Sequence, residues 1–101
     1  MKKLTPRSAH ARLKTRPGWA VQGSAIQKLY TFNSFPDAIT FVTRLAFDAQ
    51  EADHHPDLQI SYRKVTVTWT THDAGGLTPK DFAGAEQSDM IASRMLPRDK
   101  G

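Results

Sequence analysis

The chain has 101 residues, 39% of them hydrophobic and 24% charged, and it contains no cysteine. These values indicate one globular domain over residues 1–101 with a buried core, and they exclude a disulfide scaffold, a thiolate zinc site and a thiol nucleophile. No apolar run approaches the roughly 18 residues of a membrane span, and the N-terminus lacks the apolar stretch of a secretory signal. A cytoplasmic location is therefore expected.

The net charge of +4 is concentrated at the start of the chain. Residues 1–36 contain no acidic residue, and their cations are Lys2, Lys3, Arg7, Arg12, Lys14, Arg16 and Lys28. Such a segment could contact nucleic acid, act as a transit peptide or form a solvated helix face. The helix signals within it favour the solvated face, so we expect neither nucleic acid nor a membrane as a partner.

The first predicted elements are a short helix and a pair of strands. Thr5 followed by Pro6 is typical of an N-cap and first helical turn, and the helix should run to about Lys14. Pro17-Gly18 then interrupts it. The strands and the turn between them are predicted at Trp19–Gln22, Gly23-Ser24 and Ala25–Thr31.

The clearest helix begins at Ser34, with Pro36 in its first turn and Asp37 as the acidic member of a capping-box variant. It must stop near His55, because a residue that precedes proline is pushed out of the helical region. Apolar residues at helical spacing define one predicted buried stripe: Phe35, Ala38, Ile39, Val42, Leu45, Ala46 and Ala49.

The second half of the chain predicts two more strands and a last helix. Lys64–Thr70 alternates apolar residues with threonines, which is typical of a half-buried strand, and Gln59–Ser61 is a shorter strand before it. Thr78, Pro79 and Asp81 repeat the capping pattern and open the helix. Its inward residues are predicted to be Phe82, Ala85, Ala92 and Met95, and residues 97–101 to be a flexible tail.

The resulting order is α-β-β-α-β-β-α. Strands that follow one another through short turns pair antiparallel, and helices bury one face of the sheet. We therefore expect an α+β fold with a four-stranded antiparallel sheet covered on one face by three helices.

Three of the four histidines lie in one 19-residue window, at His54, His55 and His72. Imidazole both gives and accepts protons near neutrality, because its ordinary pKa is about 6.5. His54 and His55 end the long helix, where the negative end of the helix dipole favours a charged imidazolium. His72 follows the Lys64–Thr70 strand, so it should lie at the sheet edge near the mouth of a cleft.

Two other interpretations of these histidines stay open. Three histidines can bind zinc, although adjacent ones rarely point at one ion and no pair lies at i, i+4. Alternatively, all three could be structural surface residues. Asp81 also has two interpretations, as a capping residue only or as a carboxylate that approaches His72 and sets its tautomer. Metal-free acid/base chemistry is the favoured prediction.

The spacing of these residues resembles that of pterin-4a-carbinolamine dehydratases. The family pattern is an acidic residue, three positions, His-His-Pro, five positions, an aromatic, nine positions, a histidine, and an aspartate about eight positions later. Here His54-His55-Pro56 is followed at those spacings by Tyr62, His72 and Asp81. The acidic position falls on Gln50, with Glu51 one place later, so the orienting charge is either absent or supplied by Glu51.

The resemblance implies dehydration of a 4a-hydroxytetrahydropterin to the quinonoid dihydropterin, which recycles the cofactor of aromatic amino-acid hydroxylases. It implies an acid/base pair of His54 and His72 supported by Asp81, without metal or organic cofactor. Predicted substrate contacts are His55, Pro56, Tyr62, Thr70 and Thr71. Family members usually form homo-oligomers, dimers or tetramers, and a hydroxylase of the same pathway is a candidate partner. The alternative is a non-catalytic assembly protein or transcriptional co-regulator with the same fold.

Overall fold

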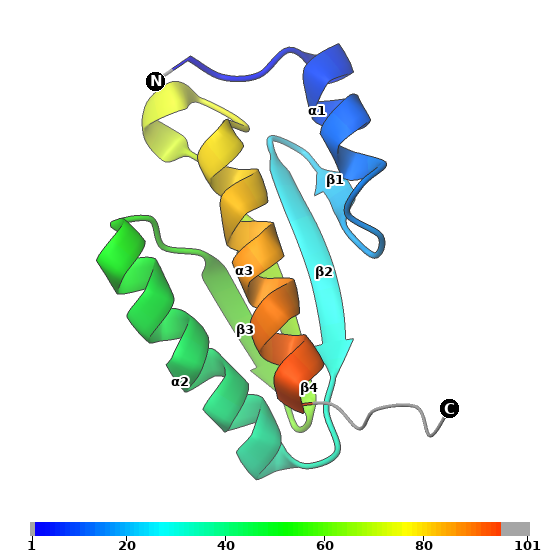
Figure 1. Ribbon diagram of the computed structural model, residues 1–101, viewed down its shortest axis with the longest axis vertical. Coiled ribbons are helices and arrows are strands. Elements are labelled where there is room, and N and C mark those ends of the chain that lie inside the picture. Colours follow the sequence, from blue (N-terminus) through cyan, green and yellow to red (C-terminus); the bar gives the residue numbers. More distant parts are fainter. Residues whose placement is uncertain (1, 96–101) are drawn as a thin grey trace.

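The computed structural model describes residues 2–95, and Figure 1 shows how the elements are arranged. In chain order they are α1 (Pro6–Leu13), β1 (Ala20–Gln22), β2 (Ala25–Thr31), α2 (Phe35–Ala52), β3 (Asp57–Ser61), β4 (Lys64–Trp69), the 3₁₀ turn η1 (His72–Ala74) and α3 (Pro79–Met95). The predicted tail at residues 97–101 lies outside the described range. Within residues 2–95 no helix has the length and apolarity needed to cross a membrane.

The four strands form one antiparallel sheet in the order β1-β2-β4-β3. Helices α2 and α3 lie side by side across one face, and α1 lies beyond the β1 edge near the start of α3 (Figure 1). This confirms the predicted α+β architecture. The alternating pattern of β4 places one face of this strand in the core. Val65, Val67 and Trp69 are buried under the helices, and the threonines between them face outward.

Two boundaries differ from the predicted ones by two or more residues. β3 begins at Asp57 rather than Gln59, because Pro56 leaves the chain extended and Asp57 pairs with Thr68 of β4. α2 ends at Ala52 rather than near His55, because Asp53 adopts a left-handed conformation. Both differences lie at the end of the sheet where the histidines gather.

The predicted stripe on α2 is only partly buried. Ala38, Leu45 and Ala49 face the sheet as expected, together with Phe41, which the prediction omitted. Phe35 and Ile39 are exposed, by 48% and 37%. Apolar residues occupy a wider arc of this helix than the sheet can cover. The predicted buried face was therefore rotated away from the observed one, towards the exposed Phe35 and Ile39.

A half-buried carboxylate, Asp89 of α3, ties the basic N-terminal segment to the core. It accepts hydrogen bonds from Tyr30 (2.5 Å), Lys28 (2.8 Å) and Trp19 (3.1 Å) and an ion pair from Arg16 (3.4 Å). Two of the cations that give the segment its charge are therefore paired inside the fold. Arg16 and Lys28 therefore stabilise the packing of α3 against the N-terminal segment and β2.

The Tyr30 phenol should make the free energy of unfolding decrease at alkaline pH. Burial, followed by the hydrogen bond to Asp89, raises the pKa of Tyr30 far above its ordinary value of 10.0. Above pH 10 the unfolded chain loses the proton while the folded chain keeps it, so the free energy of unfolding should fall by about 1.4 kcal/mol per pH unit. Below pH 10 both states keep the proton, and the Tyr30 hydrogen bond contributes in full to the free energy of unfolding.

Urea denaturation of wild type and Tyr30→Phe at about pH 8 and about pH 11 measures this effect. At the lower pH wild type should be more stable by about 1 kcal/mol, the usual contribution of one hydrogen bond. At the higher pH the difference should shrink or reverse. A difference that is the same at both pH values contradicts the retained proton.

Candidate active site

The end of α2 turns the chain so that His54 faces α3. Asp53 adopts the left-handed conformation (φ 52°, ψ 40°), and its N–H bonds the Gln50 carbonyl at 3.1 Å. The N–H of His54 bonds the Ala49 carbonyl at 3.1 Å, which completes a Schellman closure. Aspartate tolerates this conformation better than most residues. The helix therefore ends three residues before the predicted stop at His55.

His54 and Asp81 form the central contact of the site. Nε2 of His54 lies 2.6 Å from Oδ1 of Asp81, and the aspartate is fully buried while the His54 side chain is 13% exposed. The distance is that of a short, charge-assisted hydrogen bond. An ionised carboxylate can only accept hydrogen bonds, so an ionised Asp81 requires the hydrogen on Nε2 and leaves Nδ1 as the ring nitrogen for other chemistry.

The second oxygen of Asp81 is held by two donors of the protein. Oδ2 accepts from the Thr71 hydroxyl at 2.8 Å and from the backbone N–H of Thr78 at 2.9 Å. Thr78 in turn accepts the Lys80 N–H at 3.3 Å, so the predicted capping pattern is present. Asp81 is thus both a cap and a histidine partner, but the histidine is His54 and not His72 as the sequence suggested.

Trp69 forms the surface on which His54 rests. The two rings are stacked with centroids 5.3 Å apart and planes inclined by 25°. The indole N–H donates to Ser88 of α3 at 3.2 Å, which fixes the ring. Gly84 completes the fit, because a Cβ at this position would lie 2.6 Å from the indole. Trp69 and Gly84 together let α3 approach β4 closely.

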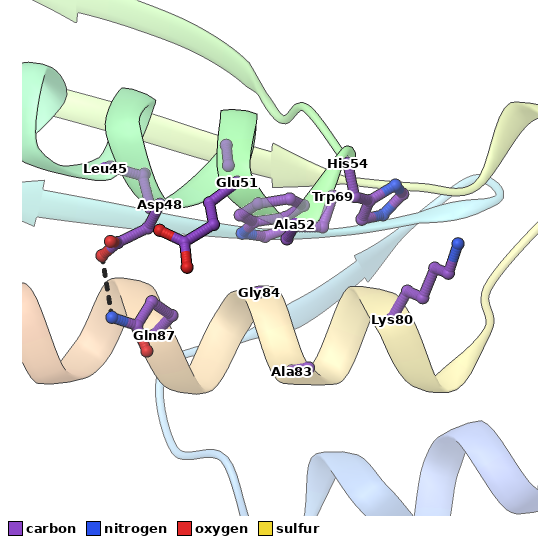
Figure 2. A pocket seen from close by; sticks show the side chains of 11 residues that line it. Leu45, Asp48, Glu51, Ala52, His54, Trp69, Lys80, Ala83, Gly84 and Gln87 are labelled. Atoms are coloured by element: carbon purple, nitrogen blue, oxygen red, sulfur yellow. Dashed lines mark hydrogen bonds between the residues drawn. The ribbon is translucent and has the colours of Figure 1, made fainter.

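A pocket of about 510 Å³ opens between the C-terminal half of α2 and the first half of α3 (Figure 2). Its volume lies in the range of small-molecule sites. His54 and Lys80 lie at one end, and a hydrogen bond of 2.8 Å from Gln87 to Asp48 crosses the other end. The remaining lining residues are Leu45, Ala49, Glu51, Ala52, Trp69, Ala83 and Gly84.

The structure brings His54, Asp81 and Thr71 together and leaves the other predicted site residues apart from them. His55 is exposed and its Nε2 lies 2.9 Å from Oε1 of Gln50. His72 is exposed at the start of η1 and does not line the pocket. Within residues 2–95 no group of three His, Asp or Glu side chains is placed to hold a metal ion.

The remaining predicted contacts lie around or away from this end of the sheet. The Thr70 hydroxyl donates to the Ser24 carbonyl at 2.7 Å, and Pro56 precedes β3. Tyr62 is 70% exposed in the β3–β4 turn, at the end of the hairpin opposite Trp69. A direct role for Tyr62 at the pocket is therefore not visible in this arrangement, and its predicted substrate contact stays a prediction.

Sequence reasoning missed several residues that line the pocket. Trp69 was expected only as a core residue of its strand, since alternation cannot separate a core ring from the floor of a site. Lys80 and Gln87 are surface residues by type, and only the approach of α3 to α2 gives them a shared cavity. Two signals pointed to this end of α3, the capping sequence before Asp81 and the family spacing that ends at Asp81.

Fold and site together define a small α+β protein with a histidine–carboxylate pair at one end of a pocket. A sequence model of the pterin 4 alpha carbinolamine dehydratase family matches residues 2–91. The chain belongs to this family.

Relatives of known sequence agree with this assignment. A protein of Roseiflexus sp. (strain RS-1) named "Putative pterin-4-alpha-carbinolamine dehydratase" is 51% identical over 89 residues, which are 88% of this chain and 96% of the relative. A protein of the same name from Picosynechococcus sp. (strain ATCC 27264 / PCC 7002 / PR-6) is 48% identical over 88% of this chain and 97% of its own length.

Two solved structures share the fold. A "transcriptional coactivator/pterin dehydratase" from Brucella melitensis superposes with a TM-score of 0.86 and 33% identity, covering 90% of this chain and 99% of that one. A pterin dehydratase-like protein described as a RuBisCO assembly factor in the alpha-carboxysome has a TM-score of 0.64 and 24% identity over 74% of this chain and 89% of its own. The second likeness shows the fold alone.

The Trp69–Gly84 contact predicts a specific stability effect. Gly84→Ala should lower the free energy of unfolding by about 1–3 kcal/mol, because the methyl group overlaps an indole that the core and Ser88 hold in place. In a Trp69→Leu background the same change should be neutral or stabilising, since helices prefer alanine to glycine by about 1 kcal/mol. Urea denaturation measures the effect of Gly84→Ala on the free energy of unfolding in the two backgrounds. Equal losses in both contradict the Trp69–Gly84 contact.

Proposed function

We propose that this protein is a hydro-lyase that dehydrates a 4a-hydroxytetrahydropterin to the quinonoid dihydropterin by histidine acid/base catalysis. The observation that carries the proposal is the His54–Asp81 pair at the end of a pocket of ligand size. Family membership supports a pterin carbinolamine as the substrate class. Recycling of the tetrahydropterin used by aromatic amino-acid hydroxylases is the proposed role of the reaction.

His54 is the proposed general acid. With Nε2–H committed to Asp81, a protonated ring presents its second proton on Nδ1. That proton passes to the 4a-hydroxyl, the C4a–O bond breaks, and water leaves while a ring nitrogen supplies the electron pair for the new C=N bond. Asp81 stabilises the imidazolium before the transfer and holds the ring orientation after it.

His72 is the proposed second acid/base group, which takes up the proton that the pterin ring releases. It follows Thr71, whose hydroxyl binds Asp81, so the backbone that carries His72 is anchored to the same network. His55 is proposed as a substrate contact, with Gln50 holding its Nε2. These two roles require the exposed rings to turn towards bound substrate. A cytoplasmic homo-oligomer is the proposed form of the enzyme.

A dehydratase assay on chemically generated carbinolamine tests the proposal. His54→Gln and His72→Gln should each lower the rate by roughly 10²–10⁴-fold, because a general acid or base contributes about that much. His55→Gln should cost clearly less, and His10→Gln, an exposed histidine on α1, is the matched control.

The wild-type rate decides the function itself. A folded wild-type protein that does not accelerate decay of the carbinolamine contradicts the proposed activity. Equal and small losses for all three variants would instead refute the division of roles among the histidines.

A further inference from the structure

Glu51 is a pocket carboxylate that the fold leaves without a partner. It lies in the last turn of α2, lines the pocket, and its side chain extends into the space between α2 and α3 (Figure 2). Among residues 2–95 no hydrogen bond or ion pair engages its side chain, although Lys80 lines the same pocket. Its two oxygens are therefore free to accept hydrogen bonds.

Asp48, the other acid that lines the pocket, has one oxygen engaged, and the buried Asp81 near His54 has both engaged. Asp48 accepts from Gln87 at 2.8 Å, and both oxygens of Asp81 are bonded to groups of the protein. Gln50, the residue before Glu51, does not line the pocket, and its Oε1 lies 2.9 Å from Nε2 of His55. The last turn of α2 thus places the Gln50 amide outside the pocket and the exposed Glu51 carboxylate at the pocket wall.

We propose that Glu51 binds the amino edge of the pterin ring. A pterin carries an N3–H and a 2-amino group side by side, and these two parallel donors match the two oxygens of one carboxylate. The inference rests on the proposed function and names the group that recognises its substrate class. With this edge held on α2, the fused ring extends towards the end of the pocket that His54 occupies.

Bidentate binding of this kind makes the pocket selective for the 2-amino group. Lumazine has an oxygen in place of the 2-amino group of pterin, so it offers the carboxylate an acceptor where a donor is needed. A site built to hydrogen-bond a donor rejects an analogue that lacks it, because the site's polar group is left unpaired. Glu51 is therefore proposed as a specificity-determining residue.

Binding of pterin and lumazine to the purified full chain, followed by ligand fluorescence at neutral pH, tests this assignment. Wild type should bind pterin roughly 10- to 100-fold more tightly than lumazine, the range expected for a hydrogen bond to a charged group. Glu51→Gln should lose most of its pterin affinity and nearly all of this preference, because an amide has one acceptor and adds a donor. Glu51→Asp keeps the charge and should retain part of the preference.

Glu86→Gln is the matched control, since Glu86 is an exposed glutamate of α3 outside the pocket, and it should bind as wild type does. A Glu51→Gln protein that keeps the wild-type preference overturns the role of Glu51 while leaving pterin binding intact. Absence of pterin binding to wild type contradicts the proposed function, and this inference with it.

Discussion

The buried Asp81 carboxylate is the group on which the rest of the site depends. A charge removed from water is costly unless donors surround it, and three groups from three separate segments do so here. The segment after β4 contributes Thr71, the residue before α3 contributes Thr78, and the segment after α2 contributes His54. Satisfying one carboxylate therefore joins these segments at a single point.

This arrangement explains why the fold and the site cannot be separated. The Schellman closure at Asp53 directs His54 towards α3, and the close packing of Gly84 on Trp69 brings α3 near enough to meet it. Asp89 anchors the other half of α3 to the N-terminal segment and β2. Helix α3 is thus anchored by two carboxylates. Asp81 lies in its first turn and is proposed to support catalysis, and Asp89 lies in its second half and is structural.

Much of the fold was predictable because its signals are local. Alternation in β4 and the capping residues of α2 and α3 depend on short-range sequence, and these elements appear where expected. The orientation of α2 was not predictable, because its apolar arc includes the exposed Phe35 and does not show which part of the arc faces the sheet. For the site, spacing identified His54 and Asp81 as important but paired Asp81 with His72. The partner depends on the left-handed turn at Asp53, which has no strong sequence signal.

The proposed chemistry depends on one proton position: Asp81 holds the proton of His54 on Nε2 and so leaves Nδ1 to act on substrate. Nitrogen-15 NMR of the His54 ring, in wild type and Asp81→Asn, tests it directly. The wild-type ring should carry a proton on Nε2 across neutral pH, and this preference should be lost in the variant, where an amide N–H can face the ring. A wild-type ring whose Nε2 carries no proton would contradict it.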